Sequence, residues 1–243
     1  LKLTRKYYTE DMPDGRVKHI VQNITDPDIV PYIPFVLECR LPSDEHDNAE
    51  DVPLIDAMRA MRVIRGRAQE FGIDEAKIGV MGFSAGGFMA ALLSTAYESD
   101  VYADYKYKDE YDKLSARPDF AVCSYPVISI DDCIEAGKRY MSEEQVLERI
   151  SDGKAKILHK YNPDKLVRPD MPPVFICETD DDRTTLSENS VGFYMAARKA
   201  GVSAELHIFR TGGHGYGCGD DFAQTGEWKV LFTKWIKSIG IIS

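Results

Sequence analysis

Short apolar runs alternate with amphipathic stretches along the chain from about residue 36 onward. Residues 52–71 have helical spacing and are followed by Gly72, which ends the pattern. The apolar side chains on one face of this helix are Leu54, Ile55, Met58, Met61 and Ile64. Nearly continuous apolar runs predict strands at residues 35–41, 77–83, 120–128, 173–179 and 204–209. Further helices are predicted at about 86–97, 143–150, 187–200 and 225–239.

This order of elements predicts a single α/β domain over residues 1–243. Strands that are apolar on both faces belong in a sheet with helices on each side. Repeated strand, helix and strand units give a mostly parallel sheet with right-handed crossovers. A chain of 243 residues is long enough to bury one such core. Ligands bind such sheets at the carboxyl ends of the strands, so the chemistry is expected there.

A tyrosine-rich segment, residues 97–118, interrupts the alternation. It is polar and charged, and it stands where a helix and the next strand would otherwise connect directly. Its tyrosines are Tyr97, Tyr102, Tyr105, Tyr107 and Tyr111. One hypothesis is a solvated helical insertion. The other is a flap over the pocket, because tyrosine offers a ligand both an apolar ring and a hydroxyl. The first is favoured, since surface insertions need not be functional.

The charge balance argues against one class of partner. The chain has 30 Lys and Arg against 40 Asp and Glu, a net charge of −10, which disfavours a nucleic-acid surface. No run of about 18 apolar residues is present, so no membrane span is expected. The sequence begins at Leu1 without the apolar core of a signal peptide. Localisation is therefore open between the cytoplasm and secretion after removal of a leader.

The cysteines do not form a recognisable framework. They are Cys39, Cys123, Cys133, Cys177 and Cys218, and no two of them make a C-x-x-C pair. Neither a set of disulfides nor a zinc site is expected, and no other metal site is assigned. Cys39, Cys123 and Cys177 lie inside apolar runs, where a thiol behaves as a small buried hydrophobe.

The pentapeptide Gly82-Phe83-Ser84-Ala85-Gly86 is the strongest candidate for chemistry. It has the form G-x-S-x-G, in which a tight turn from a strand into a helix pushes the serine hydroxyl out above the sheet. A predicted strand precedes it and a helical pattern follows it, as this turn requires. Ser84 is therefore predicted to be a nucleophile, which needs a histidine base and an acid behind that base.

The base is expected downstream of the nucleophile, because in this fold the order along the chain is Ser, then Asp or Glu, then His. Three histidines qualify: His159, His207 and His214. His207 lies within a predicted strand, and His159 within an apparently helical stretch. His214 follows the last strand in the glycine-rich loop "RTGGHGYGCG", where backbone freedom can bring an imidazole to the serine. His214 is the predicted base.

The acid is expected just after the strand at 173–179. Glu178, Asp180, Asp181 and Asp182 all stand there, and the pattern alone does not choose among the aspartates. Adjacent carboxylates repel one another, so two of the three aspartates are expected to be solvated or to accept backbone hydrogen bonds in a turn.

These motifs resemble those of the carbohydrate acetyl esterases and small carboxylesterases of the α/β-hydrolase superfamily, which are related to dienelactone hydrolases and prolyl oligopeptidases. The resemblance runs from about Ile24 to Trp235. It is carried by "RLP" (40–42), "KIGVMGFSAGG" (77–87), "KLSARPDFAVCSYPVIS" (113–129), "PPVFICETDDDRTTLSENS" (172–190) and "GGHGYG" (212–217). The family's D-x-x-V-P-x-E-N-S segment aligns on Glu188-Asn189-Ser190 and implies Asp182 as the acid, with Asp181 as the alternative. Thr185-Leu186-Ser187 replaces the usual valine and proline region.

The N-terminal part departs from the family. Similar enzymes carry a glycine-rich loop that supplies oxyanion-hole N–H groups, but this chain has no glycine between Gly15 and Gly66. The missing piece would hold a strand, this loop and a helix, and its place is between Pro34 and Phe35. Either the sequence lacks a segment that the protein carries, or the protein is a natural short form with another donor, or it is a weakened or inactive relative. Exposed strand edges would then favour a homo-oligomer.

The expected function is a serine esterase that acts on short acyl esters, for example acetyl groups on a plant polysaccharide such as xylan. Ser84 would attack, His214 would carry the proton, Asp182 would hold His214, and the Ala85 N–H would bind the oxyanion. No cofactor is implied. A peptidase is the nearest rival enzyme, but the chain has no room for the propeller domain of prolyl peptidases. The rival from another class is a binding protein of hydrolase fold.

Overall fold

The computed structural model of the chain describes residues 4–11, 17–24, 33–40, 48–103, 105–150, 160–217 and 225–243. The strands are β1 (Thr4–Asp11), β2 (Val17–Ile24), β3 (Val80–Phe83), β4 (Ala121–Ser124), β5 (Val174–Thr179) and β6 (Ala204–Phe209). The helices are α1 (Val52–Gly66), α2 (Ala68–Phe71), α3 (Ala85–Ala96), α4 (Ile130–Gly137), α5 (Glu143–Ile150), α7 (Ser187–Lys199) and α8 (Trp228–Ser238). Short 3-10 helices are η1 (Asp100–Tyr102), η2 (Glu110–Lys113), η3 (Pro163–Leu166) and η4 (Thr225–Glu227).

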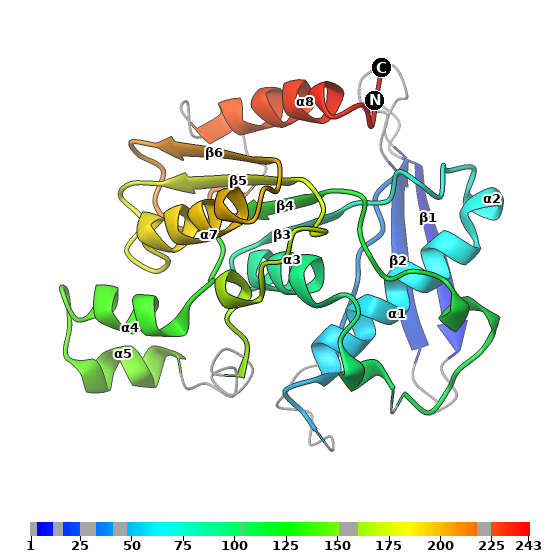
Figure 1. Ribbon diagram of the computed structural model, residues 1–243, viewed down its shortest axis with the longest axis horizontal. Coiled ribbons are helices and arrows are strands. Elements are labelled where there is room, and N and C mark those ends of the chain that lie inside the picture. Colours follow the sequence, from blue (N-terminus) through cyan, green and yellow to red (C-terminus); the bar gives the residue numbers. More distant parts are fainter. Residues whose placement is uncertain are drawn as a thin grey trace.

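Four strands form a parallel sheet in the order β3-β4-β5-β6. Helix α8 covers one face, and α3 and α7 cover the other (Figure 1). Side chains alternate along each strand. Val122 and Phe175 therefore pack on α8, while Ala121 and Ile176 pack towards α3 and α7. The α/β fold with helices on both faces of a parallel sheet is thus confirmed. Within the described ranges no helix is both long and apolar enough to cross a membrane.

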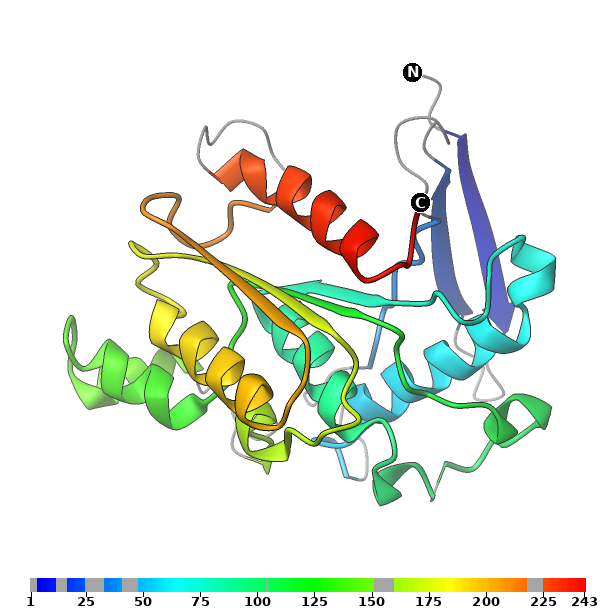
Figure 2. The same ribbon diagram turned by 45° about the horizontal axis from the view of Figure 1, so that its top comes forward.

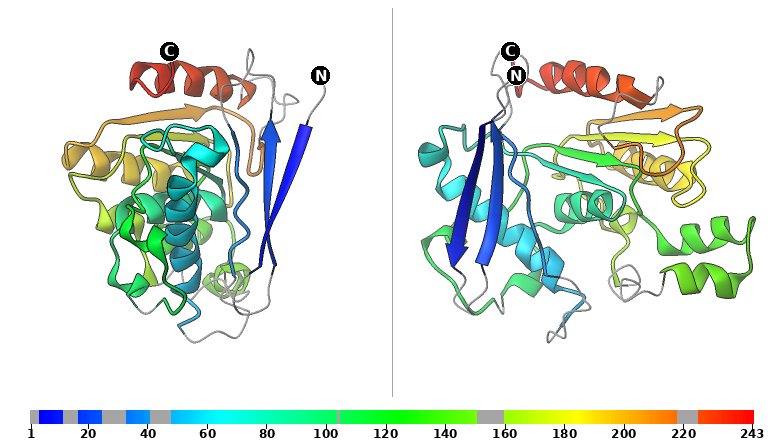
Figure 3. Two further views of the ribbon diagram at one scale, coloured as in Figure 1. Left: turned by 90° about the vertical axis from the view of Figure 1, so that its right-hand side faces the viewer. Right: turned by 180° about the vertical axis from the view of Figure 1, so that it is seen from behind.

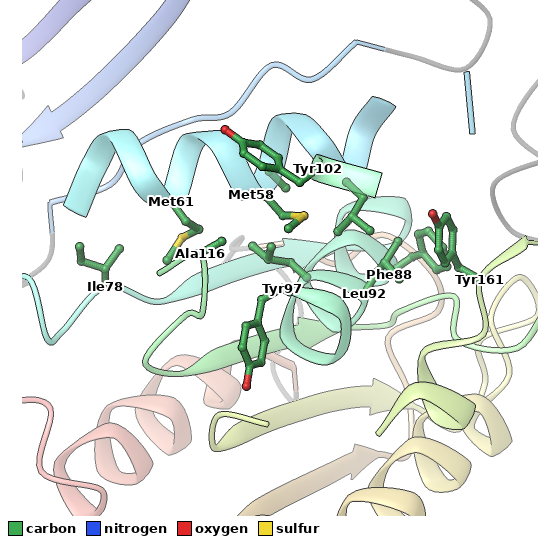
Figure 4. Close-up of a cluster of buried hydrophobic side chains, with 12 residues drawn as sticks. Met58, Met61, Ile78, Phe88, Leu92, Tyr97, Tyr102, Ala116 and Tyr161 are labelled. Atoms are coloured by element: carbon green, nitrogen blue, oxygen red, sulfur yellow. The ribbon is translucent and has the colours of Figure 1, made fainter. Parts of the chain in front are cut away.

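Helix α1 packs beside α3. Leu54, Met58 and Met61 of α1 are buried together with Phe88 and Leu92 of α3 (Figure 4). The predicted apolar face of this helix is therefore the face that enters the core. Gly72 has φ 68°, the left-handed conformation that stops a helix and that glycine adopts without strain.

The predicted strand at 35–41 is wrong. Residues 36–40 are extended but belong to no strand, and Phe35 is a single bridge residue. In the described part of the chain the segment does not pair with β3, which remains the outermost strand on that side of the sheet. Arg40 instead binds the buried Asp56 of α1, with Nη2 2.6 Å from Oδ1. An apolar run becomes a strand only where a neighbour accepts its backbone hydrogen bonds.

A hairpin and a helix were not predicted. β1 and β2 pair antiparallel as a separate two-stranded sheet (Figure 3). Helix α4 follows β4, and the Ser129 hydroxyl caps it by accepting from the Asp132 N–H.

The tyrosine-rich segment packs on α1. The Arg62 guanidinium lies 4.0 Å from the centre of the Tyr102 ring, Arg59 pairs with Asp109 at 2.5 Å, and Tyr111 lies against Gly66 at the end of α1. Figure 2 shows the segment beside α1, at the end of the sheet where β3 begins. These contacts place it at the amino ends of the strands and support a packed insertion, not a flap over Ser84.

Candidate active site

The turn from β3 into α3 holds Ser84 in a conformation that few residues adopt. Ser84 has φ 54° and ψ −117°, a strained geometry typical of functional sites. The turn is so tight that a Cβ on Gly82 would lie 1.9 Å from the Gly86 carbonyl oxygen. Glycine at position 82 is therefore a steric requirement. The Phe88 N–H donates to the Ser84 carbonyl, which starts the helix directly after the serine.

The loop after β6 brings His214 to this serine. The Ser84 Oγ lies 2.8 Å from the His214 Nε2. Gly213 and Gly215, on either side of the histidine, have φ 62° and 90°, values that L-residues with side chains rarely adopt. The Gly213 N–H donates to the Asp181 Oδ1 at 2.7 Å, and its carbonyl accepts from the Thr179 hydroxyl at 3.0 Å. The loop is thus fixed on both sides of the imidazole.

Asp182 completes the chain of hydrogen bonds. Its Oδ2 lies 2.7 Å from the His214 Nδ1, and its Oδ1 accepts from the N–H groups of Thr184 and Thr185 at 2.7 and 3.0 Å. Burial by itself would raise the pKa of Asp182. The hydrogen bonds from His214 and the two backbone N–H groups outweigh burial, and the pKa lies below its ordinary value. Asp182 is therefore an anion. Asp181, the alternative acid, binds the histidine loop instead.

Glu178 is a second carboxyl group at this place, which the sequence offered among the candidate acids without its being chosen. It lies in β5, fully buried, where its two oxygens accept from the Thr179 N–H and the Ser190 hydroxyl. It also contacts the Asp182 carboxylate. Burial, together with the charge of Asp182, raises the pKa of Glu178 to about 9. Glu178 is thus neutral at pH 7. A glutamate inside an otherwise apolar strand was the available signal.

The comparison with protein families is decisive for the identity of the fold. The BD-FAE family profile matches residues 32–196, which include the serine turn, Asp182 and most of α7. The chain belongs to the BD-FAE family. This family consists of α/β-hydrolase carbohydrate esterases, in agreement with the resemblance carried by the motifs.

Curated relatives of this BD-FAE chain are much longer than it is. It is 30% identical over 207 residues to the acetylxylan esterase of Xylanibacter ruminicola, covering 84% of this chain and 38% of the relative. It is 32% identical over 170 residues to the endo-1,4-beta-xylanase B of Butyrivibrio fibrisolvens, covering 70% of this chain and 25% of that enzyme. The chain thus spans less than half the length of either relative.

Solved structures share the fold. An acetyl ester-xyloside bifunctional hydrolase from Caldicellulosiruptor lactoaceticus is 37% identical, with a TM-score of 0.70 over 87% of this chain and 73% of that chain. A thermophilic esterase from Thermogutta terrifontis, solved with propionate bound, is 27% identical with a TM-score of 0.65, over 87% of this chain and 73% of that one. A carboxylesterase from Lactobacillus plantarum, 17% identical with a TM-score of 0.67 over 99% of both chains, shows the fold alone.

The remaining predicted residues of the BD-FAE chain are placed as follows. Ala85, the expected oxyanion donor, is the first residue of α3, so its N–H belongs to a helix N-terminus, where anions are stabilised. His207 lies in β6 and pairs with Glu205 at 2.7 Å. His159 lies outside the described residues. Among those described, no three His, Cys, Asp or Glu side chains are placed to hold a metal ion.

Proposed function

We propose that this chain is a serine esterase that removes short acyl groups, with acetyl groups on a plant polysaccharide such as xylan as the substrate. One observation carries the proposal. The Ser84 hydroxyl, the His214 imidazole and the buried Asp182 carboxylate form one hydrogen-bonded line, with contacts of 2.8 and 2.7 Å. This line lies where β3, β5 and β6 end, the place where parallel sheets bind ligands.

The geometry supports an acyl-enzyme mechanism. His214 Nε2 takes the proton of the Ser84 hydroxyl as its oxygen attacks the ester carbonyl, and the electron pair of the C=O bond moves to the oxygen. The Ala85 N–H donates to this oxyanion. As the tetrahedral intermediate collapses, the alcohol leaves with the proton from His214. Water then attacks the acyl-serine in the same way and releases the carboxylic acid. Asp182 holds the imidazole throughout.

The missing glycine-rich loop predicts slow turnover. Loss of one oxyanion donor costs about 100- to 1000-fold in kcat in enzymes of this mechanism. The chain runs directly from Pro34 into Phe35, and the extended segment that follows contains no glycine. We therefore expect a weak esterase unless another N–H group takes the place of the loop.

The relatives support the choice of substrate. The name of one relative is acetylxylan esterase and that of another is a xylanase, and a related esterase was solved with propionate bound. Short acyl groups on xylan are therefore the first substrates to test, with acetate before propionate and butyrate.

Hydrolysis of an activated acetate ester and of acetylated xylan tests the proposal. Wild type is compared with Ser84→Ala and with Ser203→Ala, an exposed serine in the turn before β6. Wild type and Ser203→Ala should release acetate at the same rate, and Ser84→Ala should be inactive. If wild type and Ser84→Ala give indistinguishable traces, the chain is a binding protein of hydrolase fold and the esterase proposal is wrong.

We also propose that the chain self-associates. In the described part of the chain β3 is the outermost strand on its side of the sheet, and Met81 of β3 is exposed, as are Val36 and Leu37 in the preceding segment. Strand edges with apolar side chains favour pairing with another chain. Light scattering at micromolar concentration should give the mass of a dimer or larger species, and Met81→Lys should lower it. A wild-type monomer would contradict the proposal.

A further inference from the structure

Thr185 is a buried residue between β5 and α7, next to the triad but not part of it. Threonine and valine have nearly the same shape, so threonine at this position differs from a purely apolar side chain by one hydroxyl group and little else. Packing alone does not require a hydroxyl at a fully buried position, where a polar group costs free energy unless it is hydrogen-bonded.

The Thr185 hydroxyl lies among three polar atoms of the site. Its Oγ1 is 3.0 Å from the Asp182 Oδ2, 3.2 Å from the His214 Nδ1 and 3.2 Å from the Tyr125 carbonyl oxygen. A hydroxyl has a single hydrogen to donate. The His214 Nδ1 proton is already directed to the Asp182 Oδ2, which is the nearer atom at 2.7 Å. The hydroxyl hydrogen therefore goes to either Asp182 or Tyr125.

Electrostatics favours Asp182. If the hydrogen pointed to Tyr125, an oxygen lone pair of Thr185 would face the negative Asp182 Oδ2 at 3.0 Å. If it points to Asp182, the hydrogen bond is charge-assisted, the stronger kind. Asp182 then accepts from the N–H groups of Thr184 and Thr185 on Oδ1, and from His214 and the Thr185 hydroxyl on Oδ2. The neutral Glu178 carboxyl also contacts this buried carboxylate.

We propose that Thr185 is a positioning residue: its hydroxyl donates to the Asp182 Oδ2 and holds the carboxylate in the orientation that faces His214. This hydrogen bond also stabilises part of the negative charge of Oδ2, which would otherwise be stabilised mainly by the hydrogen bond from His214. The inference rests on the proposed esterase function. Thr185 touches no reacting atom and acts only through Asp182 and His214.

The pH dependence of turnover follows from this arrangement. With valine at position 185, the Asp182 Oδ2 loses one of its two donors, so its charge acts more strongly on the imidazole and favours the protonated ring. Ser84 requires the neutral ring, so the acid limb of the kcat/KM profile moves to higher pH. The other titratable groups that face Asp182 and His214 are unchanged by the substitution. In the described residues they are Glu178 of β5, Cys133 of α4, Asp181 of the same turn and Tyr125 after β4.

Two matched pairs of variants isolate the hydroxyl. Wild type and Thr185→Val have the same shape and differ in the hydroxyl, and Thr185→Ser and Thr185→Ala both lack the methyl group and differ in the hydroxyl. In each pair, the member without the hydroxyl should have its acid limb about 0.5 to 1 pH unit higher. On that limb this corresponds to a loss of about 3- to 10-fold in kcat/KM at a fixed pH. The second pair serves if Thr185→Val does not fold.

The outcomes are distinct. If the acid limbs of the kcat/KM profiles coincide within each pair of variants, Thr185 is only a packing residue and the inference is overturned. This holds with or without a loss of thermal stability. A shift that follows the missing methyl group and not the missing hydroxyl would also overturn it. If wild type hydrolyses acetate esters no faster than Ser84→Ala, the esterase proposal fails instead, and that result is separate from the comparison within the pairs.

Discussion

Replacement of Glu178 by glutamine should stabilise the protein relative to wild type, and this difference in unfolding free energy should grow as the pH rises. Burial raises the pKa of Glu178 to about 9, from an ordinary value of 4.5. An acid whose pKa is raised by folding contributes stability that is fully present below the unfolded-state pKa and is lost as the pH rises towards the folded-state pKa. The pH window for Glu178 is therefore 4.5 to about 9.

The magnitude follows from the proton balance. Within this window the unfolded chain releases a proton that the folded chain keeps, so the free energy of unfolding falls by up to ~1.4 kcal/mol per pH unit. At pH 7 the accumulated loss is about 3 kcal/mol relative to pH 4. Glutamine has no proton to release. Its amide oxygen can still accept from the Thr179 N–H and its NH2 group can donate to Asp182, but the Ser190 hydroxyl loses its wild-type acceptor, a cost that does not depend on pH.

Urea denaturation at pH 5, 6, 7 and 8 measures this effect. The fluorescence of Trp228 and Trp235, both buried in the native core, reports unfolding. The difference in unfolding free energy between Glu178→Gln and wild type should grow in favour of the variant by about 1 kcal/mol for each pH unit. The control is Glu144→Gln, on the exposed side of α5, for which the difference should stay flat.

A difference that is the same at pH 5 and pH 8 would refute the reasoning. It would mean that Glu178 is ionised in the folded protein over the whole range, and that the pair with Asp182 carries two negative charges.

Three further predictions test other parts of the site and the fold. Asp182→Asn should lower kcat by about 10⁴-fold because the imidazole loses the partner that fixes its tautomer, whereas Asp181→Asn should lower it far less; initial rates on an acetate ester compare the two. Gly82→Ala should not fold, since its Cβ would lie 1.9 Å from a carbonyl oxygen, while Gly86→Ala should, as no atom lies within 4 Å of the added group; soluble yield and circular dichroism distinguish them. Asp56→Asn should lower the unfolding free energy by about 3 kcal/mol because it breaks a buried ion pair, which equal urea midpoints would contradict.

Much of the fold could be predicted because the central strands are apolar on both faces. β4 and β5 are fully buried, so their sequences carry a strong signal. The segment at 35–41 has the same apolar composition, yet it is no strand, because strand formation depends on a neighbour that the segment itself does not contain. The hairpin of β1 and β2 was missed for the converse reason. Its composition does not mark it as a pair of strands, and the two segments become strands because they pair with each other.

The candidate site was predictable as far as local chemistry goes. The turn around Ser84 has steric needs that appear as glycines, and the glycine-rich loop marks His214. The choice of Asp182 over Asp181 came from the alignment of the following residues, because adjacent carboxylates look alike in sequence. The protonation of Glu178 and the contacts of Thr185 depend on side chains brought together from β5, α7 and the loop after β6. No spacing in the sequence encodes those distances.

The position of the tyrosine-rich segment matters for protein engineering. Its anchors to α1 lie at the end of the sheet opposite the serine turn, so changes there should affect unfolding without reaching the acyl-transfer chemistry. A mutant library confined to residues 97–118 could therefore be screened for heat resistance alone. Turnover of an acetate ester after heating would then measure the fraction of protein that remains folded. The same separation makes this segment a suitable point for attachment to a solid support, since the serine turn lies at the other end of the sheet.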